Sequence, residues 1–417
     1  MSKTKPFIIS KSIIWESYQA VKENRGSSGV DNVSLEIFEQ DLKKNLYKLW
    51  NRMSSGSYFP LPVKQVEIPK KGGGKRPLGI PTVSDRIAQM AVKKLIEPKL
   101  DPYFHENSYG YRPGKSALEA VGQCRRRCWR YDWVLDMDIK GFFDNVRHDL
   151  LLLALKRHVR ESWILLYIER WLESPVKTTE GELIPREKGT PQGAVISPLL
   201  ANLYLHYCLD EWLRINYPEI PFERYADDQV CHCRTKEEAG KLKAAIGTRL
   251  KECGLELHPD KTQIVYCKDD DRTGNHDHTK FDFLGYTFRS RRSKNRYGKY
   301  FVNFTPAVSQ QSMKSIRQEM RSWKVHLRSD KSLEDLGRMF DSKIRGWINY
   351  YGRFYKSELY KVFRHLNGSL IRWAMRKFKK LRHHRRRARH WLGRVSRKDS
   401  YLFYHWKWGV KPEVYGQ

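Results

Sequence analysis

The sequence has no long hydrophobic run. No stretch approaches the roughly 20 apolar residues that a bilayer-spanning helix needs. Its start, MSKTKPFIISKSIIWES, has too short an apolar segment and too many polar residues for a secretion signal. We therefore expect a cytoplasmic protein with no membrane partner.

Cysteine is also scarce. An odd number, seven in 417 residues, does not indicate a disulfide framework. Cys124 and Cys128 in CRRRC, together with Cys231 and Cys233, could bind zinc. Because the usual CxxC spacing is absent, buried free thiols are the favoured interpretation.

Acidic residues are few toward the C-terminus. The chain has 79 Lys and Arg against 47 Asp and Glu, a net charge of +32. From Tyr286 onward there are 34 basic and 8 acidic residues, which account for +26 of that charge. The same region holds six tryptophans, and aromatic residues need burial or a stacking partner. The composition therefore predicts a folded module that binds a polyanion.

Hydrophobic spacing divides the chain into three regions. Residues 11–25 have helical spacing, and residues 63–81 alternate around three glycines as in a β-hairpin. The basic stretch 289–299 is the best candidate boundary, because helical periodicity dominates after it. We expect a helical N-terminal extension at 1–50, a second domain at 51–288 and a basic helical domain at 289–417.

Three carboxylates stand at predicted strand ends. Asp138 closes the strand VLDMDI, and Asp227 and Asp228 lie at the turn of FERYADDQV. An isolated Asp pair is most often a turn, but strand ends can meet in one sheet, and such a cluster needs cations. Carboxylates suit Mg²⁺, and two Mg²⁺ ions serve in-line phosphoryl transfer. Asp136 shares the strand face of Asp138, so periodicity leaves both possible; Asp144 is interpreted as a cap or turn residue.

Several motifs then occur in a fixed order. They are KRPLGIPTVSDRIAQ at 75–89, SYGYRPGKSA at 108–117, DIKGFFD at 138–144, GTPQGAVISPLLANLYL at 189–205, YADD at 225–228, LELHPDKT at 255–262, FLGY at 283–286 and GWINYYGRF at 346–354. The series resembles that of reverse transcriptases, and more narrowly that of bacterial group II intron-encoded proteins, which are reverse transcriptase and maturase in one chain. The resemblance runs from about residue 15 to the C-terminus. It implies an α+β right-hand polymerase with fingers, an antiparallel palm sheet flanked by helices, and an α-helical thumb or maturase domain X.

The resemblance also implies a metal site. The metal-binding aspartates of the family match Asp138, Asp227 and Asp228. We expect Asp138 and Asp227 to bridge two Mg²⁺ ions and Asp228 to contribute less directly. The implied activity is RNA-directed DNA polymerisation, with an RNA template, a DNA primer and deoxynucleoside triphosphates.

Further positions would contact the incoming nucleotide by the same resemblance. Lys70 and Arg76 flank the glycines of the hairpin and would hold the triphosphate. Phe143 would occupy the space of a ribose 2′-hydroxyl, and Gln192 would contact the sugar. Lys261 is a candidate to assist the leaving phosphate, and the alternative interpretation is a surface lysine without that role.

The implied RNA partner is a structured group II intron RNA, bound by the thumb and the N-terminal extension to assist splicing and mobility into target DNA. Ten Lys or Arg and no acid occur between Arg372 and Arg389, and opposite phosphates such charges release counterions. The candidate RNA contacts are Arg112, Arg372, Arg376, Lys377, Arg385, Arg386 and Arg387. The interleaved Trp373, Phe378 and Trp391 either seat this segment on the bundle or stack on bases.

Two alternatives stay open. One is a splicing cofactor with an idle polymerase centre, against which the aspartates, Phe143 and Gln192 argue. The other is a retron or defence reverse transcriptase, which the GWINYYGRF segment disfavours. Because the chain stops at Gln417 with no later Cys or His cluster, we expect no endonuclease domain and a priming nick made otherwise. The sequence does not determine the oligomeric state.

Overall fold

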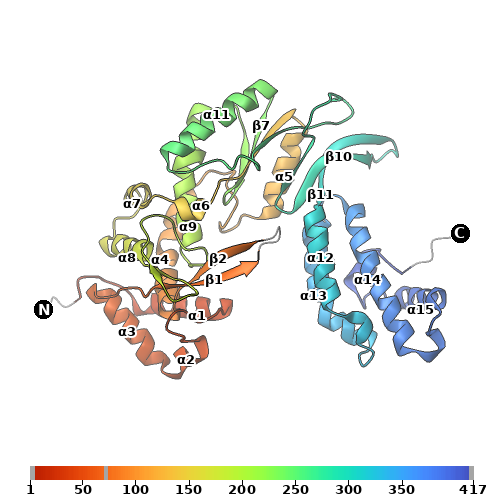
Figure 1. The fold of residues 1–417 in the computed structure, drawn as a ribbon, viewed down its shortest axis with the longest axis horizontal. Coiled ribbons are helices and arrows are strands. Elements are labelled where there is room, and N and C mark those ends of the chain that lie inside the picture. Colours follow the sequence, from red (N-terminus) through yellow and green to blue (C-terminus); the bar gives the residue numbers. More distant parts are fainter. Residues whose placement is uncertain (1–4, 70–73, 413–417) are drawn as a thin grey trace. The chain divides into compact units, whose positions relative to one another are not determined.

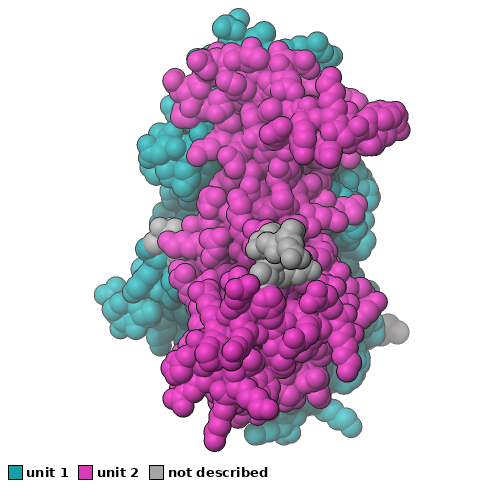
Figure 2. Space-filling view, turned by 90° about the vertical axis from the view of Figure 1, so that its right-hand side faces the viewer, with its two compact units in different colours: residues 1–120, 133–264 teal, residues 121–132, 265–417 magenta. Residues whose placement is uncertain are grey.

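The computed structural model describes residues 5–69 and 74–412. The chain divides into two compact units, coloured separately in Figure 2. Unit 1 comprises Met1–Ala120 and Trp133–Ile264, and unit 2 comprises Val121–Asp132 and Val265–Gln417. Lys70, expected to hold a triphosphate, lies outside the described residues. All seven cysteines are buried.

Unit 1 begins with amphipathic helices (Figure 1). The helix predicted at 11–25 is present as α1 (Lys11–Asn24), which buries Ile14, Tyr18 and Val21 and packs against α4 (Val83–Leu100). This three- to four-residue spacing is the one by which a helix presents a single apolar face. Two further helices lie between them in the chain, α2 (Leu35–Gln40) and α3 (Leu42–Ser55).

The glycine-containing segment forms the predicted hairpin. β1 (Val63–Pro69) pairs antiparallel with β2 (Lys75–Ile80), with Lys64 opposite Ile80 and Ile68 opposite Arg76. Two short strands, β4 (Val176–Lys177) and β5 (Leu183–Ile184), complete a sheet of order β2-β1-β4-β5. Arg76 therefore stands one residue from the start of β2, near the hairpin tip.

A second sheet carries the three acids. Its order is β6-β7-β3-β8, formed by β6 (Phe222–Tyr225), β7 (Asp228–Cys233), β3 (Trp133–Met137) and β8 (Gln263–Tyr266). β7 pairs antiparallel with both β6 and β3. Val134, Leu135, Val230 and Cys231 are fully buried. These apolar residues hold the strands at the centre of unit 1, so the acids at their ends have fixed positions.

Helices surround this sheet. α11 (Lys236–Glu252) packs against β3 and β7, and it buries Leu242, Ile246 and Leu250 at helical spacing. The other helical elements of unit 1 are η1 (Asp101–Tyr103), α6 (Phe142–Asn145), α7 (His148–Lys156), α8 (Ser162–Glu173), α9 (Ser197–Leu205), the π-helical turn η2 (His206–Asp210) and α10 (Glu211–Asn216). The chain passes into unit 2 within α5 (Ala117–Cys128) and within β8.

Unit 2 joins a three-stranded sheet to helices. β9 (Lys280–Phe283), β10 (Tyr286–Lys294) and β11 (Tyr300–Val308) form an antiparallel sheet of order β11-β10-β9. The helical elements are α12 (Gln310–Ser322), η3 (Val325–Leu327), α13 (Leu333–Tyr351), α14 (Lys356–Lys377), η4 (Lys379–Leu381), α15 (Arg385–Lys398) and α16 (Tyr404–Lys407). They share one apolar core, in which Trp323 stacks on Phe340 with ring centroids 4.3 Å apart. The tryptophans of the basic region are thus buried or half-buried in this core, as the composition of the region indicated.

The stretch 289–299, expected as a boundary, belongs to the β10–β11 hairpin. Phe288 and Arg291 on β10 and Phe304 on β11 are buried, while the residues from Lys294 to Tyr300 are exposed. The basic residues there lie at the exposed end of a pair of strands whose other end is in the core. The change from strands to helices therefore comes after Val308. None of the described helices is both long and apolar enough to cross a membrane.

Candidate active site

Asp138 and Asp227 are placed by adjacent strands of unit 1. Asp138 follows the last residue of β3, and Asp227 lies in the two-residue turn between β6 and β7. Met137 pairs with Gln229, so extending the antiparallel register by one residue sets Asp138 opposite Asp228. Ala226 adopts a left-handed φ of 56°, which tightens the turn and holds the two acids at the strand ends.

The three carboxylates repel one another. Burial raises the pKa of Asp227, and the charge of Asp138 adds to this rise while Arg76 opposes it. Burial by the surrounding protein is the largest cause that raises the pKa of Asp228 to about 7, and the charges of Asp227 and Asp138 add to the rise. Part of the residue is nevertheless exposed to water. Lys261 donates to Asp138 Oδ2 at 2.8 Å. The cluster thus holds more negative charge than this lysine neutralises.

A cavity of about 470 Å³ opens beside the acids. Its lining includes six residues that sequence reasoning singled out, namely Arg76, Asp138, Phe143, Gln192, Asp227 and Lys261. They come from the β1–β2 hairpin, the ends of β3 and β6, α6, and the loops before α9 and β8. Asp228 and Asp136 are not part of this lining. The structure therefore brings Asp138, rather than Asp136, to the cavity beside Asp227.

The TPQG loop enters the cavity because two glycines allow close backbone contact. Gly193 has a φ of +112°, and a Cβ there would lie 2.7 Å from Gly79 O. The Gly79 amide donates to Gln192 O at 2.7 Å, which ties the loop to β2. Thr190 donates its amide to Phe143 O at 2.8 Å. The loop therefore fixes Gln192 and Phe143 in one wall.

Tyr111 and His258 are among the cavity residues that were not singled out from the sequence. Tyr111 lies in the quoted motif SYGYRPG, and His258 in LELHPDKT. The His258 amide donates to Asp138 O at 2.8 Å. Burial raises the pKa of Tyr111, and the charge of Asp227 adds to this rise. The left-handed φ of Tyr111, 55°, is a backbone feature that residue type does not signal.

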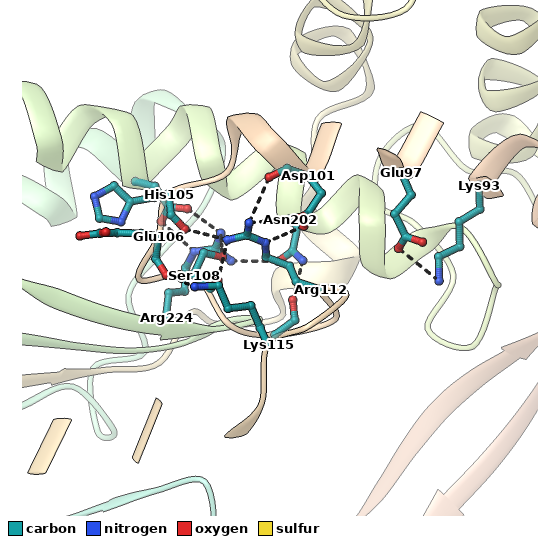
Figure 3. Close-up of polar contacts among 12 residues, drawn as sticks. Lys93, Glu97, Asp101, His105, Glu106, Ser108, Arg112, Lys115, Asn202 and Arg224 are labelled. Atoms are coloured by element: carbon teal, nitrogen blue, oxygen red, sulfur yellow. Dashed lines mark hydrogen bonds and ion pairs between the residues drawn. The ribbon is translucent and has the colours of Figure 1, made fainter. Parts of the chain in front are cut away.

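A buried ion pair is connected to the turn that carries Asp227. Figure 3 labels its arginine, Arg224, with the neighbouring Ser108 and Asn202. Arg224 donates to both carboxylate oxygens of Asp210, at 2.7 and 2.6 Å, and both side chains are fully buried. Its guanidinium also donates to Ala226 O at 2.9 Å, to Ser108 Oγ at 2.8 Å and to Asn202 Oδ1 at 3.1 Å. Arg224 thus links the residue before Asp227 to a fixed buried anchor.

Arg112 lies in the same region (Figure 3). It donates to Asp101 Oδ1 at 2.7 Å and to the carbonyls of His105 and Ser108 at 2.8 Å. Only 7% of its side chain is exposed. In the structure Arg112 fixes the loop before α5, and its expected contact with nucleic acid stays a prediction.

Comparison with known proteins agrees with this geometry. Residues 68–288 match the family described as Reverse transcriptase (RNA-dependent DNA polymerase), and residues 313–391 match the Group II intron, maturase-specific domain. The chain belongs to the reverse transcriptase family. It is thus an RNA-directed DNA polymerase by family, and the α+β right-hand class predicted from the sequence is confirmed.

Individual relatives support the same assignment. Protein YkfC of Escherichia coli is 31% identical over 343 residues, which cover 72% of this chain and 85% of YkfC. The group II intron-encoded protein LtrA of Lactococcus lactis is 29% identical over 62% of this chain, but the match spans only 43% of LtrA. A telomerase structure from Candida albicans aligns with a TM-score of 0.46 and 14% identity over 90% of this chain and 68% of that one, a likeness too distant to assign a function.

The reverse transcriptase site has the donors that a divalent metal requires. Carboxylate oxygens are the preferred ligands of hard cations, and Asp138 and Asp227 present them to the same cavity. Burial is the main cause that raises the pKa of Asp227 and of Asp228, and the charges of the neighbouring carboxylates add to it. A bound cation would neutralise that negative charge. The residues present therefore fit a divalent ion.

The maturase-specific domain carries the basic residues predicted to contact RNA. Arg372, Arg376 and Arg385–Arg387 are exposed. Lys377 differs from them, because its Nζ donates to the carbonyls of Ser329 and Lys331 at 3.0 and 2.8 Å. Trp373, whose role the sequence left open, is 1% exposed and donates to Arg328 O at 2.9 Å. Trp373 therefore seats α14 on the core.

Proposed function

We propose that this reverse transcriptase copies RNA into DNA with two Mg²⁺ ions and binds a group II intron RNA to assist its splicing and mobility. The observation that carries the polymerase part is the gathering of Asp138, Asp227, Arg76, Phe143 and Gln192 around one cavity. The maturase-specific domain at 313–391 supports the splicing part. Partners would be intron RNA, RNA template, DNA primer, deoxynucleoside triphosphates and target DNA.

Asp138 and Asp227 would hold the metal, with Asp228 contributing from outside the cavity. Bound Mg²⁺ would activate the primer hydroxyl and stabilise charge on the pyrophosphate. Arg76 would bind the triphosphate, as would Lys70. Lys261, ion-paired with Asp138 and 62% exposed, would assist the leaving phosphate.

Two residues would select the sugar. Phe143 lines the cavity and packs edge-on against buried Phe142, with ring centroids 5.2 Å apart. A ring held in this way resists displacement, so a ribose 2′-hydroxyl would clash with it. Gln192, fixed through Gly79, would hydrogen-bond the sugar.

Primer extension on an RNA template tests the polymerase part. Asp227→Asn should lose nearly all activity at every Mg²⁺ concentration, because one carboxylate ligand is gone. Asp41→Asn is a matched control, since Asp41 is exposed in unit 1 and makes no side-chain cap bond. Equal extension by wild type and Asp227→Asn would contradict the metal assignment.

The splicing part is tested separately. The probe is RNA transcribed from the DNA that flanks the coding region, and the assay is splicing at low Mg²⁺ with and without protein. Asp227→Asn should still promote splicing, because RNA binding does not need the polymerase metals. Absence of a folded intron in the flanking DNA would favour a retron-type partner instead.

A further inference from the structure

The β10–β11 hairpin ends in a tip, residues 292–300, which is not part of the lining of the cavity beside Asp138 and Asp227. Its other end is firmly anchored in unit 2. Phe288 stacks on Phe281 with centroids 4.7 Å apart, and both rings are buried. Tyr355 donates to Arg292 O at 2.9 Å, and Arg291 is buried beside Glu358 at 3.7 Å. The tip is therefore the exposed end of a rigid support.

The turn itself is built around Asn295. Its side-chain oxygen accepts from the amides of Tyr297 and Lys299 at 2.9 and 3.0 Å, and its own amide donates to Lys299 O at 2.9 Å. Gly298, with a φ of +85°, supplies the left-handed position. The turn thus has a defined conformation, and it directs Tyr297 outward.

The tip presents two tyrosines to water. Tyr297 is 77% exposed and Tyr300 is 55% exposed. The guanidinium of Arg296 lies 4.7 Å from the Tyr297 ring centroid, and that of Arg292 lies 4.2 Å from the Tyr300 ring centroid. Lys294 Nζ also lies 5.4 Å from the Tyr300 ring centroid. Both rings therefore lie beside cations, and Tyr297 keeps the larger share of its surface exposed.

The charge around these rings is mostly positive. The sequence from 283 to 318 has no Asp or Glu, and across the described residues the cations at 292, 294, 296 and 299 form no ion pair with an acid. A neighbouring acid, Asp270, uses its carboxylate to accept from the Val302 amide at 2.8 Å. Exposed aromatic rings can stack on bases, and cations without an acidic partner can bind phosphates. The tip is therefore complementary to a single nucleic-acid strand.

We propose that the hairpin tip binds unpaired RNA, with Tyr297 and Tyr300 stacking on bases while Arg296 and Lys299 contact phosphates. The assignment to RNA rests on the proposed function, and the tip adds to it a contact surface outside the basic helices. Stacking requires exposed base faces, so the preferred ligand is single-stranded rather than duplex RNA.

The test measures affinity of the full-length protein for fluorescein-labelled oligo(U) and for a blunt RNA duplex of equal length. Tyr297→Ala should weaken oligo(U) binding about 5- to 100-fold, with little effect on the duplex. Tyr297→Phe should retain affinity, because the ring is kept. Tyr401→Ala is the matched control, since Tyr401 is 73% exposed in the same unit with Lys407 at 4.7 Å from its ring.

A second arm separates stacking from charge. The Arg296→Gln, Lys299→Gln variant should flatten the salt dependence by about 0.7 in log–log slope per phosphate lost, whereas Tyr297→Ala should leave the slope unchanged. Unchanged oligo(U) affinity in Tyr297→Ala would overturn the proposal. So would an equal loss of affinity for the duplex, or an equal loss of oligo(U) affinity in Tyr401→Ala.

Primer extension at saturating template and primer distinguishes this proposal from the polymerase assignment. Wild-type protein that fails to extend would overturn the polymerase part without affecting the oligo(U) measurement. Loss of oligo(U) affinity in Tyr297→Ala with normal extension would place the contact outside the catalytic cavity, as proposed.

Discussion

The Arg224–Asp210 pair offers a sharp test of how the turn that carries Asp227 is held. Arg224→Met removes the donors to Asp210, Ala226, Ser108 and Asn202 and leaves a fully buried carboxylate unpaired. Loss of one partner of a buried pair costs about 3–5 kcal/mol. We therefore expect the free energy of unfolding to fall by about that amount.

The double variant Arg224→Met, Asp210→Leu separates stability from positioning. Replacing both charges with apolar residues is often neutral or stabilising, so most of the lost stability should return. A deficit of about 1–3 kcal/mol should remain, because the Ala226 carbonyl no longer has its donor. Urea denaturation followed by circular dichroism measures both variants.

Primer extension of the double variant is the decisive measurement, made well below its unfolding midpoint. Without the Arg224 bond to Ala226 O, Asp227 loses its fixed position, and a displacement of about 1 Å costs roughly 100-fold in rate. We expect kcat to fall by about that factor while stability is largely recovered. A double variant with recovered stability and wild-type kcat would refute the positioning role.

Three further predictions follow from the same structure. Phe143→Ala should admit ribonucleotides, measured as a rise of kcat/KM for rNTP relative to dNTP, and an unchanged ratio would remove Phe143 from sugar selection. Neutralising Arg385, Arg386 and Arg387 to Gln should reduce the salt slope of RNA binding by about 2, at up to 0.9 per phosphate; an unchanged slope would show that these residues are not contacts. For metal-free protein, the pKa of Asp228 is about 7 when folded and near 4 when unfolded. The folded state then binds this proton more tightly than the unfolded state does. The contribution of Asp228 to the free energy of unfolding therefore falls as the pH rises from about 4 to 7. Thermal melts should show this fall in wild type, but not in Asp228→Asn, and Mg²⁺ should counteract it.

Residues of the candidate site could be predicted from the sequence where their residue types and their spacing both belong to one short motif. Asp227 and Asp228 are adjacent between sheet-forming residues, and the motif order added Asp138, Phe143 and Gln192. Arg76 could be predicted because it borders a glycine-rich hairpin tip. Apart from Phe143, which lies in α6, each of these residues lies at the end of a strand or in a loop, which local sequence marks well.

The supporting contacts could not be predicted in this way. Arg224 and Asp210 are 14 residues apart, and Arg224 reaches Ser108 across 116 residues. Nothing near either residue in the sequence shows that the two will be buried together, because such contacts depend on how the sheet and helices pack. Arg112 was considered for nucleic acid for the same reason, since its internal acceptors Asp101 and His105 become neighbours only in the folded loop.

By itself, the sequence determined the family, the acidic strand ends and the basic C-terminal region, because these depend on residue type and short spacing. Strand alternation puts Asp136 and Asp138 on one face, so periodicity left both possible and the family resemblance chose Asp138. Only the tertiary structure decided that Asp138 lines the cavity with Asp227. It also decided that residues 289–299 form a hairpin with an exposed aromatic tip. That outcome depends on burial of Phe288 and Phe304 at the opposite end, which a count of charges does not reveal.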